Sequence, residues 1–253
     1  MRLGTRLSLP HSRRLAPYSR VYYSRPLQAR RCLIHTSPLR PRPATSEEEL
    51  RYPDPSSKEH HDVPSYEAYA TRIGLDKNAT VYVGTRYEYT VAAALRQFGF
   101  DLTRIGRAGD YGIDLLGTWA VPSAPRPLRV LLQCKVSSAN TRIGPSMVRE
   151  IEGAFTGAPP GWRGSSVIGL LVTHRPSTKG IRESLGRSKW PMGFISCSSD
   201  GAVQQMLWNS RAEEEGLAGM GIGVRLSEAS SDQELVLTWK GKPVPSNEQS
   251  MSQ

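Results

Sequence analysis

The stretch GIDLLG at residues 112–117, followed by VLLQCK at residues 130–135, decides the fold of this chain. Both pieces are apolar runs bounded by glycine or proline, a pattern typical of buried β-strands. The connection at residues 121–127 is rich in proline, serine and alanine, so we expect a β-hairpin with a loose turn. Polar side chains are costly to bury in such strands unless they have a function. Three interrupt these runs: Asp114, Gln133 and Lys135.

Strand alternation predicts that Gln133 and Lys135 project from one face together with Leu131, while Cys134 projects from the other. If Asp114 points the same way, a carboxylate, an amide oxygen and an ammonium group meet across two neighbouring strands. Oxygen ligands suit Mg²⁺ or Mn²⁺. A lysine beside such a cation can position the attacking water and offset the charge that develops on a phosphate. The sequence therefore indicates a divalent-cation site beside a scissile phosphate.

These residues resemble the Asp…(Glu/Gln)-x-Lys motif of the restriction-endonuclease-like, or PD-(D/E)XK, superfamily. The form GIDLL followed by QCK is most similar to its Mrr-type branch. With its arginine-rich N-terminal segment, the chain also resembles a fungal mitochondrial family named for being required for respiratory growth, specifically the seventh member. The resemblance covers about residues 81–197. It implies an α/β fold with an αβββαβ core, in which helices flank a mixed central sheet.

The resemblance also implies roles for the polar residues. Asp114 would be the main metal ligand, Gln133 and the backbone carbonyl of Cys134 would complete the ligand set, and Lys135 would position or activate the water. The chain departs from the usual pattern at Gln133, where the superfamily commonly has an acid. A neutral amide oxygen is a weaker metal ligand than a carboxylate, and this favours a second interpretation in which the fold is kept without turnover.

Glu88 has two interpretations. It lies three residues after Thr85, the spacing of a capping box at the start of a helix expected to end near Phe98. The superfamily commonly has a glutamate that faces the metal in its first helix, in a Gly-x-x-Tyr/Phe-Glu context. The segment GTRYE at residues 84–88 resembles that context. Glu88 is therefore either a helix cap or a further metal ligand and catalytic residue.

The net charge of +10 is concentrated at the N-terminus of the 253-residue chain. Residues 1–46 contain ten arginines and no acidic residue, whereas the remainder has 23 basic and 23 acidic side chains. The basic balance therefore does not by itself predict that the folded part binds nucleic acid. The three cysteines form no Cys-x-x-Cys pair or Cys/His cluster, which argues against a zinc site. No apolar run approaches the length of a membrane span, so no transmembrane segment is expected.

Residues 1–40 have the composition of a mitochondrial transit peptide, rich in arginine and free of acids. The segment RCLIHT at residues 31–36 resembles leaders that are trimmed in two steps. We therefore expect recognition by the mitochondrial import machinery and a location in the matrix. The alternative is a basic tail that binds nucleic acid. Residues 41–80 are interpreted as a linker with a short helix, in which His60 and His61 are solvated.

The core domain is expected at residues 81–200. A short apolar segment at residues 81–84 precedes the first helix. A later helix is expected to be capped by Ser146, with Glu150 and Glu152 solvated off its apolar stripe. Ser177 or Thr178 is expected to cap the next one. Further strands are expected at residues 101–106, 166–173 and 192–197, the second of them covered on both faces.

Residues 201–253 are expected to form a C-terminal extension. Residues 202–208 are interpreted as helical, and residues 224–226 and 234–239 as a hairpin. The chain from Gly241 onward is expected to be disordered.

Three functions remain open from the sequence. The first is a Mg²⁺-dependent endonuclease or exonuclease that acts on nucleic acid, mitochondrial DNA in the first place, as a monomer or a homodimer. The second is a catalytically inactive nuclease-fold protein that binds nucleic acid or assists assembly in mitochondrial genome maintenance or expression. The third is a structural subunit in which Asp114 and Lys135 form a buried ion pair without a metal.

Overall fold

The computed structural model describes residues 50, 52–54, 57–106, 112–136, 143–226 and 233–245. The chain divides into a unit of residues 1–46 and a unit of residues 47–253. The expected transit peptide therefore lies outside the described residues. All elements below belong to the second unit.

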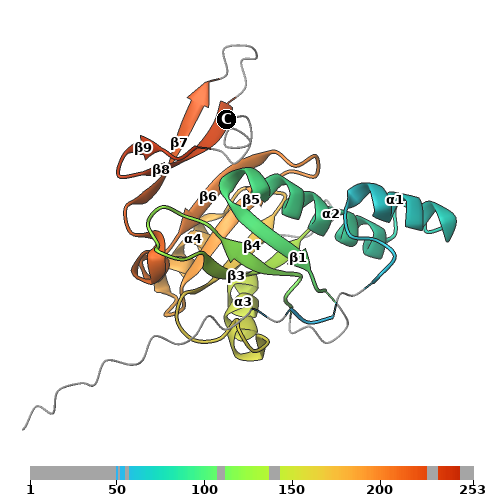
Figure 1. The fold of residues 1–253 in the computed structure, drawn as a ribbon, viewed down its shortest axis with the longest axis horizontal. Helices are drawn as coiled ribbons and strands as arrows, with labels where there is room; N and C mark the ends of the chain where they lie inside the picture. Colours follow the sequence, from blue (N-terminus) through green and yellow to red (C-terminus); the bar gives the residue numbers. More distant parts are fainter. Residues whose placement is uncertain are drawn as a thin grey trace, which may run out of the picture. The chain divides into compact units, whose positions relative to one another are not determined.

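The central sheet has six strands in the order β1-β2-β3-β4-β5-β6 (Figure 1). The first three form an antiparallel meander, the next two run parallel to β3, and β6 returns antiparallel along the far edge. The strands are β1 (Phe100–Arg104), β2 (Leu115–Trp119), β3 (Leu128–Lys135), β4 (Val167–Thr173), β5 (Met192–Cys197) and β6 (Val203–Trp208).

The helices precede, interrupt and follow this sheet. They are α1 (Val63–Arg72), α2 (Thr80–Leu95) with the 3-10 turn η1 (Arg96–Phe98), α3 (Pro145–Gly157), α4 (Lys179–Arg187), α5 (Ser210–Ala212) and the π-helical turn η2 (Glu213–Leu217). The order α2-β1-β2-β3-α3-β4 is the predicted αβββαβ core. The predicted α/β fold, with a mixed central sheet flanked by helices, is confirmed.

Two apolar clusters lie on opposite faces of the sheet, as the alternation along β3 predicts. Val130 and Leu132 face a cluster that includes the buried side of α2. Leu131 faces the other cluster, which includes the buried sides of α3 and α4. Strand β4 is buried at every position, which confirms that it is covered on both faces. Burying each large aliphatic side chain contributes roughly 1.5–3 kcal/mol, so these two clusters hold the helices against the sheet.

Helix α2 begins earlier than the sequence predicts. The apolar segment at residues 81–84 belongs to the helix, which starts at Thr80. Thr85 is thus inside the helix and buried, so the capping-box interpretation of Glu88 is wrong. Valine and threonine favour extended structure locally, but Tyr82 and Tyr89 pack in one cluster with α1 when the segment is helical.

The linker before α1 is also more ordered than expected. His60 is only 7% exposed, and its Nδ1 lies 2.8 Å from the hydroxyl oxygen of Tyr89. Its ring also contacts Tyr66 at a centroid distance of 4.9 Å. The interpretation of His60 as solvated is therefore wrong, whereas the neighbouring His61 is exposed.

Two helix starts test the expected caps. Helix α3 starts at Pro145 after Gly144, with no side-chain cap, so the prediction for Ser146 is wrong. Helix α4 is capped by Thr178, whose hydroxyl accepts the N–H of Ile181 at 3.3 Å, as predicted.

The C-terminal region differs most from expectation. Residues 203–208 form strand β6 rather than a helix, because pairing with β5 satisfies their backbone at the sheet edge. The predicted hairpin is present and longer, as β7 (Met220–Leu226) and β8 (Gln233–Trp239). A short β9 (Lys242–Pro243) pairs with β8, so the chain is ordered beyond Gly241, while residues 246–253 lie outside the described residues.

Candidate active site

Asp114 lies at the end of the sheet where β1 and β3 end and β2 begins, here called the sheet edge. Its backbone N–H donates to the carbonyl of Leu132 at 2.9 Å, and its carbonyl accepts the N–H groups of Ile105 and Gly106 at 2.9 and 3.2 Å. Its side-chain Oδ2 accepts the backbone N–H of Cys134 at 2.7 Å. Both neighbouring strand ends therefore hold this carboxylate in one orientation.

A second carboxylate comes from helix α2. Glu88 forms an ion pair with Arg104 at the end of β1, and their side chains are only 13% and 12% exposed. A Cβ on Gly106 would lie 3.5 Å from Glu88 Oε2, 3.6 Å from Asp114 Oδ1 and 3.6 Å from Arg104 Nη2. Two carboxylates and a guanidinium group therefore lie next to Gly106.

Arg104 connects these groups to the N-terminal helices. Its Nη2 lies 3.4 Å from the hydroxyl of Thr85, and its Cζ lies 5.6 Å from the ring centroid of Tyr89. The Tyr89 hydroxyl donates to the backbone carbonyl of His60 at 3.0 Å. The packing of the segment before α1 is thus linked to Arg104, the cationic side chain that pairs with Glu88.

Gln133 lies at the same edge, next to the last residues of β3. It is 4% exposed, and its Oε1 has no hydrogen-bond partner among the described residues. A Cβ on Gly112 would lie 2.7 Å from Gln133 Nε2, and Gly112 has a φ of +77°. A glycine is therefore needed beside Gln133 both for space and for backbone conformation. A buried amide oxygen without a partner is costly, which makes it a candidate ligand atom.

Lys135 projects toward α3, on the face opposite α2. Its Nζ lies 3.0 Å from Glu150 Oε2, with 34% and 49% of the two side chains exposed. The interpretation of Glu150 as merely solvated is wrong. The same holds for Glu152, which accepts the Ser188 hydroxyl at 2.6 Å. The ion pair that the structure gives Lys135 is with Glu150 rather than with Asp114, which removes the basis of the structural-subunit interpretation.

The residues that the sequence analysis selects therefore lie at one end of the sheet, but among the described contacts only Glu88 and Asp114 come together. Glu88 and Asp114 approach Gly106 from α2 and β2, whereas Lys135 is engaged with α3. The donor set of two carboxylates and an amide oxygen suits a hard cation such as Mg²⁺. Within the described ranges, no group of three His, Cys, Asp or Glu side chains could hold a metal. The set fits Mg²⁺ in chemistry, with Arg104 as the competing cation at Glu88.

Cys134 is not a nucleophile in this arrangement. Burial raises the pKa of its thiol well above the usual value, and the negative charges of Asp114 and Glu88 raise it further. The thiolate is the reactive form, so at neutral pH this cysteine stays protonated. The same effect shows that both carboxylates act electrostatically on the end of β3.

A family model described as "Required for respiratory growth protein 7" matches residues 79–126 and 122–224, together more than half of the chain. The chain belongs to this family. A protein of Schizosaccharomyces pombe, named as uncharacterized and mitochondrial, is 30% identical over 157 residues. That alignment spans 60% of this chain and 61% of the relative.

A solved structure also resembles this member of the required-for-respiratory-growth family. It is the MspJI restriction endonuclease in complex with a 27-mer oligonucleotide, 15% identical, covering 54% of this chain and 30% of that one. The TM-score is 0.35. The assignment of the αβββαβ core therefore rests on the element order and strand directions given above.

Sequence reasoning missed two residues of this family member's site. Arg104 is the last residue of β1, and only its place two residues before Gly106 connects it with the site. Glu150 lies on a helix 15 residues after Lys135, and nothing in that spacing predicts contact. Both become visible only when α2, α3 and the strand ends are placed in space.

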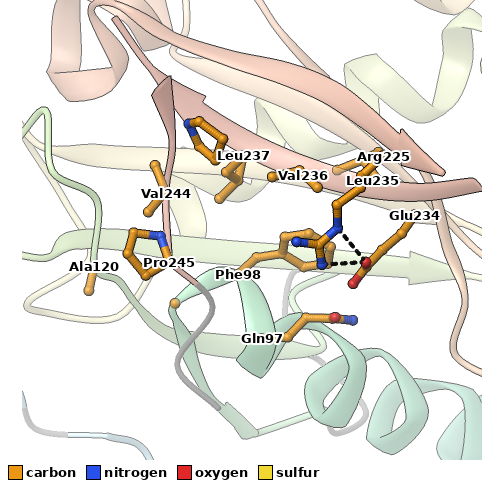
Figure 2. Close-up of a pocket in the computed structure, with 12 residues that line it drawn as sticks. Gln97, Phe98, Ala120, Arg225, Glu234, Leu235, Val236, Leu237, Val244 and Pro245 are labelled. Atoms are coloured by element: carbon orange, nitrogen blue, oxygen red, sulfur yellow. Dashed lines mark hydrogen bonds and ion pairs between the residues drawn. The ribbon is translucent and has the colours of Figure 1, made fainter. Parts of the chain in front are cut away.

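A cavity of about 280 Å³ lies elsewhere, between η1 and the C-terminal sheet (Figure 2). Phe98 and Leu235 line it, and Arg225 pairs with Glu234 at its rim at 2.7 Å. Ala120, which follows the end of β2, also lines it, whereas Asp114 precedes the start of that strand. The cavity is therefore separate from the candidate site. No helix in the described ranges is both long and apolar enough to cross a membrane.

Proposed function

We propose that this chain is a mitochondrial, Mg²⁺-dependent phosphodiesterase that cleaves nucleic acid, mitochondrial DNA in the first place. The observation that carries the proposal is the placement of Asp114, whose Oδ2 accepts the Cys134 N–H at 2.7 Å while its Oδ1 and Glu88 Oε2 would lie 3.6 and 3.5 Å from a Cβ on Gly106. Ligands bind in α/β proteins at sheet edges where strands end and topology changes, and this edge is of that kind.

The donor set determines which residues would hold the ion. Asp114 and Glu88 would supply the charged oxygens, and Gln133 Oε1 and the Cys134 carbonyl the neutral ones. A bound Mg²⁺ or Mn²⁺ would supply a Lewis acid and lower the pKa of a water molecule. Arg104, which forms an ion pair with Glu88 in the structure, would then turn its guanidinium group toward the phosphate.

Lys135 would act on the developing charge. Its ammonium group lies at the same edge as Asp114 and is partly exposed, so a phosphate oxygen can reach it. It would donate hydrogen bonds to the phosphate or to the attacking water and offset negative charge in the transition state. The ion pair with Glu150 is half exposed and therefore weak enough to rearrange when a phosphate arrives.

A mitochondrial location is part of the proposal. The family description refers to respiratory growth, and the relative from S. pombe is named as mitochondrial. The arginine-rich, acid-free residues 1–40 add a composition typical of an imported leader. We propose the matrix as the compartment, because nucleic acid is the expected partner.

A second candidate function is supported by specific observations. Gln133 provides no negative charge, and Arg104 forms an ion pair with Glu88 that offsets the charge of that carboxylate. Both features fit a nuclease-fold protein that binds nucleic acid or assists assembly without cleaving it. Fold alone does not distinguish the two functions.

The two functions can be separated by comparing the wild-type chain with Asp114→Asn. Cleavage would be measured on DNA and RNA as duplexes, single strands, flaps and junctions, with Mg²⁺ or Mn²⁺. We expect metal-dependent cleavage by the wild type and a loss of at least about 10²-fold in the variant, since removing one electrostatic group commonly costs that much. Asp101→Asn makes the same chemical change at an exposed position of β1, and this variant should cleave like the wild type.

The same proteins would be heated with and without Mg²⁺. The phosphodiesterase proposal requires that Mg²⁺ raises the melting temperature of the wild type and not of Asp114→Asn. If the wild type binds nucleic acid but cleaves none of these forms, and Mg²⁺ leaves its melting temperature unchanged, the second candidate function is correct.

A further inference from the structure

The segment at residues 174–189 is strongly basic. It contains Arg175 and four further cations, with Glu183 as its one acidic residue. It follows β4 directly and includes α4. The part of the chain after residue 46 has balanced charge, so this local excess is not a consequence of the overall composition. The four further cations are Lys179, Arg182, Arg187 and Lys189.

Helix α4 turns only its apolar side to the protein. Ile181 and Leu185 are buried in the cluster shared with α3. The basic residues of the helix are exposed, and the Lys179 side chain is 85% exposed. The exposed side of α4 and the residues just after it therefore carry four cations and one acid, Glu183, and the four cations are here called the α4 surface: Lys179, Arg182, Arg187 and Lys189.

The charges at the N-terminal end of α4 oppose helix stability. A helix N-terminus carries partial positive charge and favours acids, but the first turn of α4 has no acidic residue and begins with Lys179. Lys179 also precedes its partner Glu183, at 3.7 Å, which is the weaker orientation for an i,i+4 pair. Arg182 folds back to the same end, where its Nη1 donates to the Ser177 carbonyl at 2.7 Å. Cations concentrated at this end indicate an anionic partner.

The α4 surface starts beside the candidate active site. Thr173, the last residue of β4, pairs in register with Lys135 of β3, roughly 4.8 Å away as neighbouring strands are. The chain turns at once, since the Thr173 hydroxyl donates to the Arg175 carbonyl at 2.6 Å, and α4 begins at Lys179. From Lys179 to Arg187 the helix rises about 12 Å, which corresponds to three or four nucleotide steps of about 3.4 Å each.

We propose that the α4 surface binds the phosphodiester backbone of the nucleic acid whose scissile phosphate lies at the edge formed by Asp114 and Lys135. This inference rests on the proposed function for the position of the scissile phosphate, but binding itself does not require cleavage. The surface contacts phosphates and no base edges, so it contributes affinity that depends on salt rather than on sequence.

The test measures fluorescence anisotropy of a fluorescein-labelled 20-base-pair DNA duplex, and of the RNA duplex of the same sequence, in EDTA. The full-length chain is used, so the arginines of residues 1–46 contribute equally to every variant. We expect Lys179→Gln with Arg182→Gln to weaken binding and to reduce the slope of log K against log salt by about 2, or about 0.9 for each lost contact. Lys179→Gln alone, which removes no contact to the fold except that with Glu183, should reduce the slope by about 1.

Two further variants make the test specific. Glu183→Gln removes the acidic residue within the surface and should tighten binding. Lys242→Gln removes an exposed lysine from β9 and should leave affinity and slope unchanged. An effect with DNA alone, or with RNA alone, identifies which nucleic acid the surface fits.

An unchanged slope in the double variant, or a wild-type chain that binds neither duplex, overturns the inference. Failure of the proposed function would look different. In that case the wild type binds in EDTA with the expected dependence on the α4 surface, but it cleaves nothing when Mg²⁺ is added.

Discussion

At the scale of single residues, a substitution of Lys135 distinguishes a structural role of this lysine from a role in catalysis. Its pair with Glu150 is 34% and 49% exposed, and such pairs contribute roughly 0.2–1 kcal/mol. Lys135→Met should therefore lower the free energy of unfolding by no more than about 1 kcal/mol, while it stops cleavage and leaves Mg²⁺ binding intact. Urea denaturation, calorimetric Mg²⁺ titration and the cleavage assay measure the three quantities.

The buried ion pair with Asp114 that the sequence left open predicts another result for Lys135→Met. Breaking a buried pair costs roughly 3–5 kcal/mol, because the remaining charge loses its partner. A loss of that size, with no effect of Mg²⁺ on the wild type, would contradict the site described here. Lys242→Met, the same change at an exposed lysine, controls for the general effect of the substitution.

Gly112 offers a second test at the residue scale. A Cβ there would lie 2.7 Å from Gln133 Nε2, and the φ of +77° is unfavourable for alanine. Gly112→Ala should destabilise the protein by about 1–3 kcal/mol and weaken Mg²⁺ binding, because Gln133 must move. The melting temperature and the Mg²⁺ affinity are the readouts.

Gly153→Ala is the matched control for Gly112→Ala. Gly153 lies inside α3, where a Cβ would meet nothing within 4 Å. The same substitution should stabilise the protein there by roughly 0.5–1 kcal/mol, because alanine is the better helix former. Equal effects of the two substitutions would show that Gly112 has no special relation to Gln133.

At the scale of elements, the buried strands and the start of α4 were predictable, whereas the starts of α2 and α3 and the edge strand β6 were not. Continuous apolar runs in the sequence predict strands β3 and β4, and their burial on both faces leaves no alternative assignment. Residues 203–208 are only partly buried, so their pattern fits a helix as well as a strand, and pairing with β5 decides. The start of α2 depends on the packing of Tyr82 against α1, which local propensity does not contain.

The site was predictable to the same extent as the strands. Asp114, Gln133 and Lys135 stand out because they are polar positions in apolar runs. Arg104 and Glu150 come from the end of another strand and from a helix, so their contacts depend on tertiary packing. Sequence reasoning therefore selected the polar residues at the strand ends but not the ion pairs that Glu88 and Lys135 form in the structure.

The burial of His60, just before α1, predicts that the stability of the folded protein depends on pH. Burial, and then the positive charge of Arg104, lower the pKa of His60 below its usual value of 6.5. The unfolded chain therefore binds a proton at this residue more readily than the folded chain. Stability from the neutral His60 is complete above pH 6.5 and decreases as the pH falls through that value.

His60→Asn removes this titration and should flatten the decrease in urea midpoint between about pH 6.5 and pH 5. Its neighbour provides the control, since the His61 side chain is 84% exposed and pairs only weakly, at 3.7 Å, with exposed Asp62. His61→Asn should keep the wild-type pH dependence. A His60→Asn profile parallel to that of the wild type would show that the buried imidazole does not contribute to this transition.

At the scale of the whole molecule, the distribution of charge bears on two proposals, import through an N-terminal leader and binding of nucleic acid. Ten arginines lie in residues 1–46, and the rest of the chain has equal numbers of basic and acidic side chains. Removal of the leader therefore takes away essentially all of the net charge of +10. After import, long-range attraction to nucleic acid would be small, and binding would depend on local surfaces such as the α4 surface.

This distribution leads to a prediction about processing. N-terminal sequencing of the protein isolated from mitochondria should give a start between Leu33 and Ala44, because RCLIHT at residues 31–36 resembles a two-step cleavage site. The processed chain should bind a DNA duplex more weakly than the precursor and with a smaller salt slope, since each arginine that contacts a phosphate adds about 0.9 to that slope. The dependence on Lys179 should persist in both forms, because this residue belongs to the folded core. Two results would contradict the prediction that the N-terminal arginines serve import and are lost before the core binds nucleic acid. One is a mitochondrial protein that still begins at Met1, and the other is a processed chain whose salt slope equals that of the precursor.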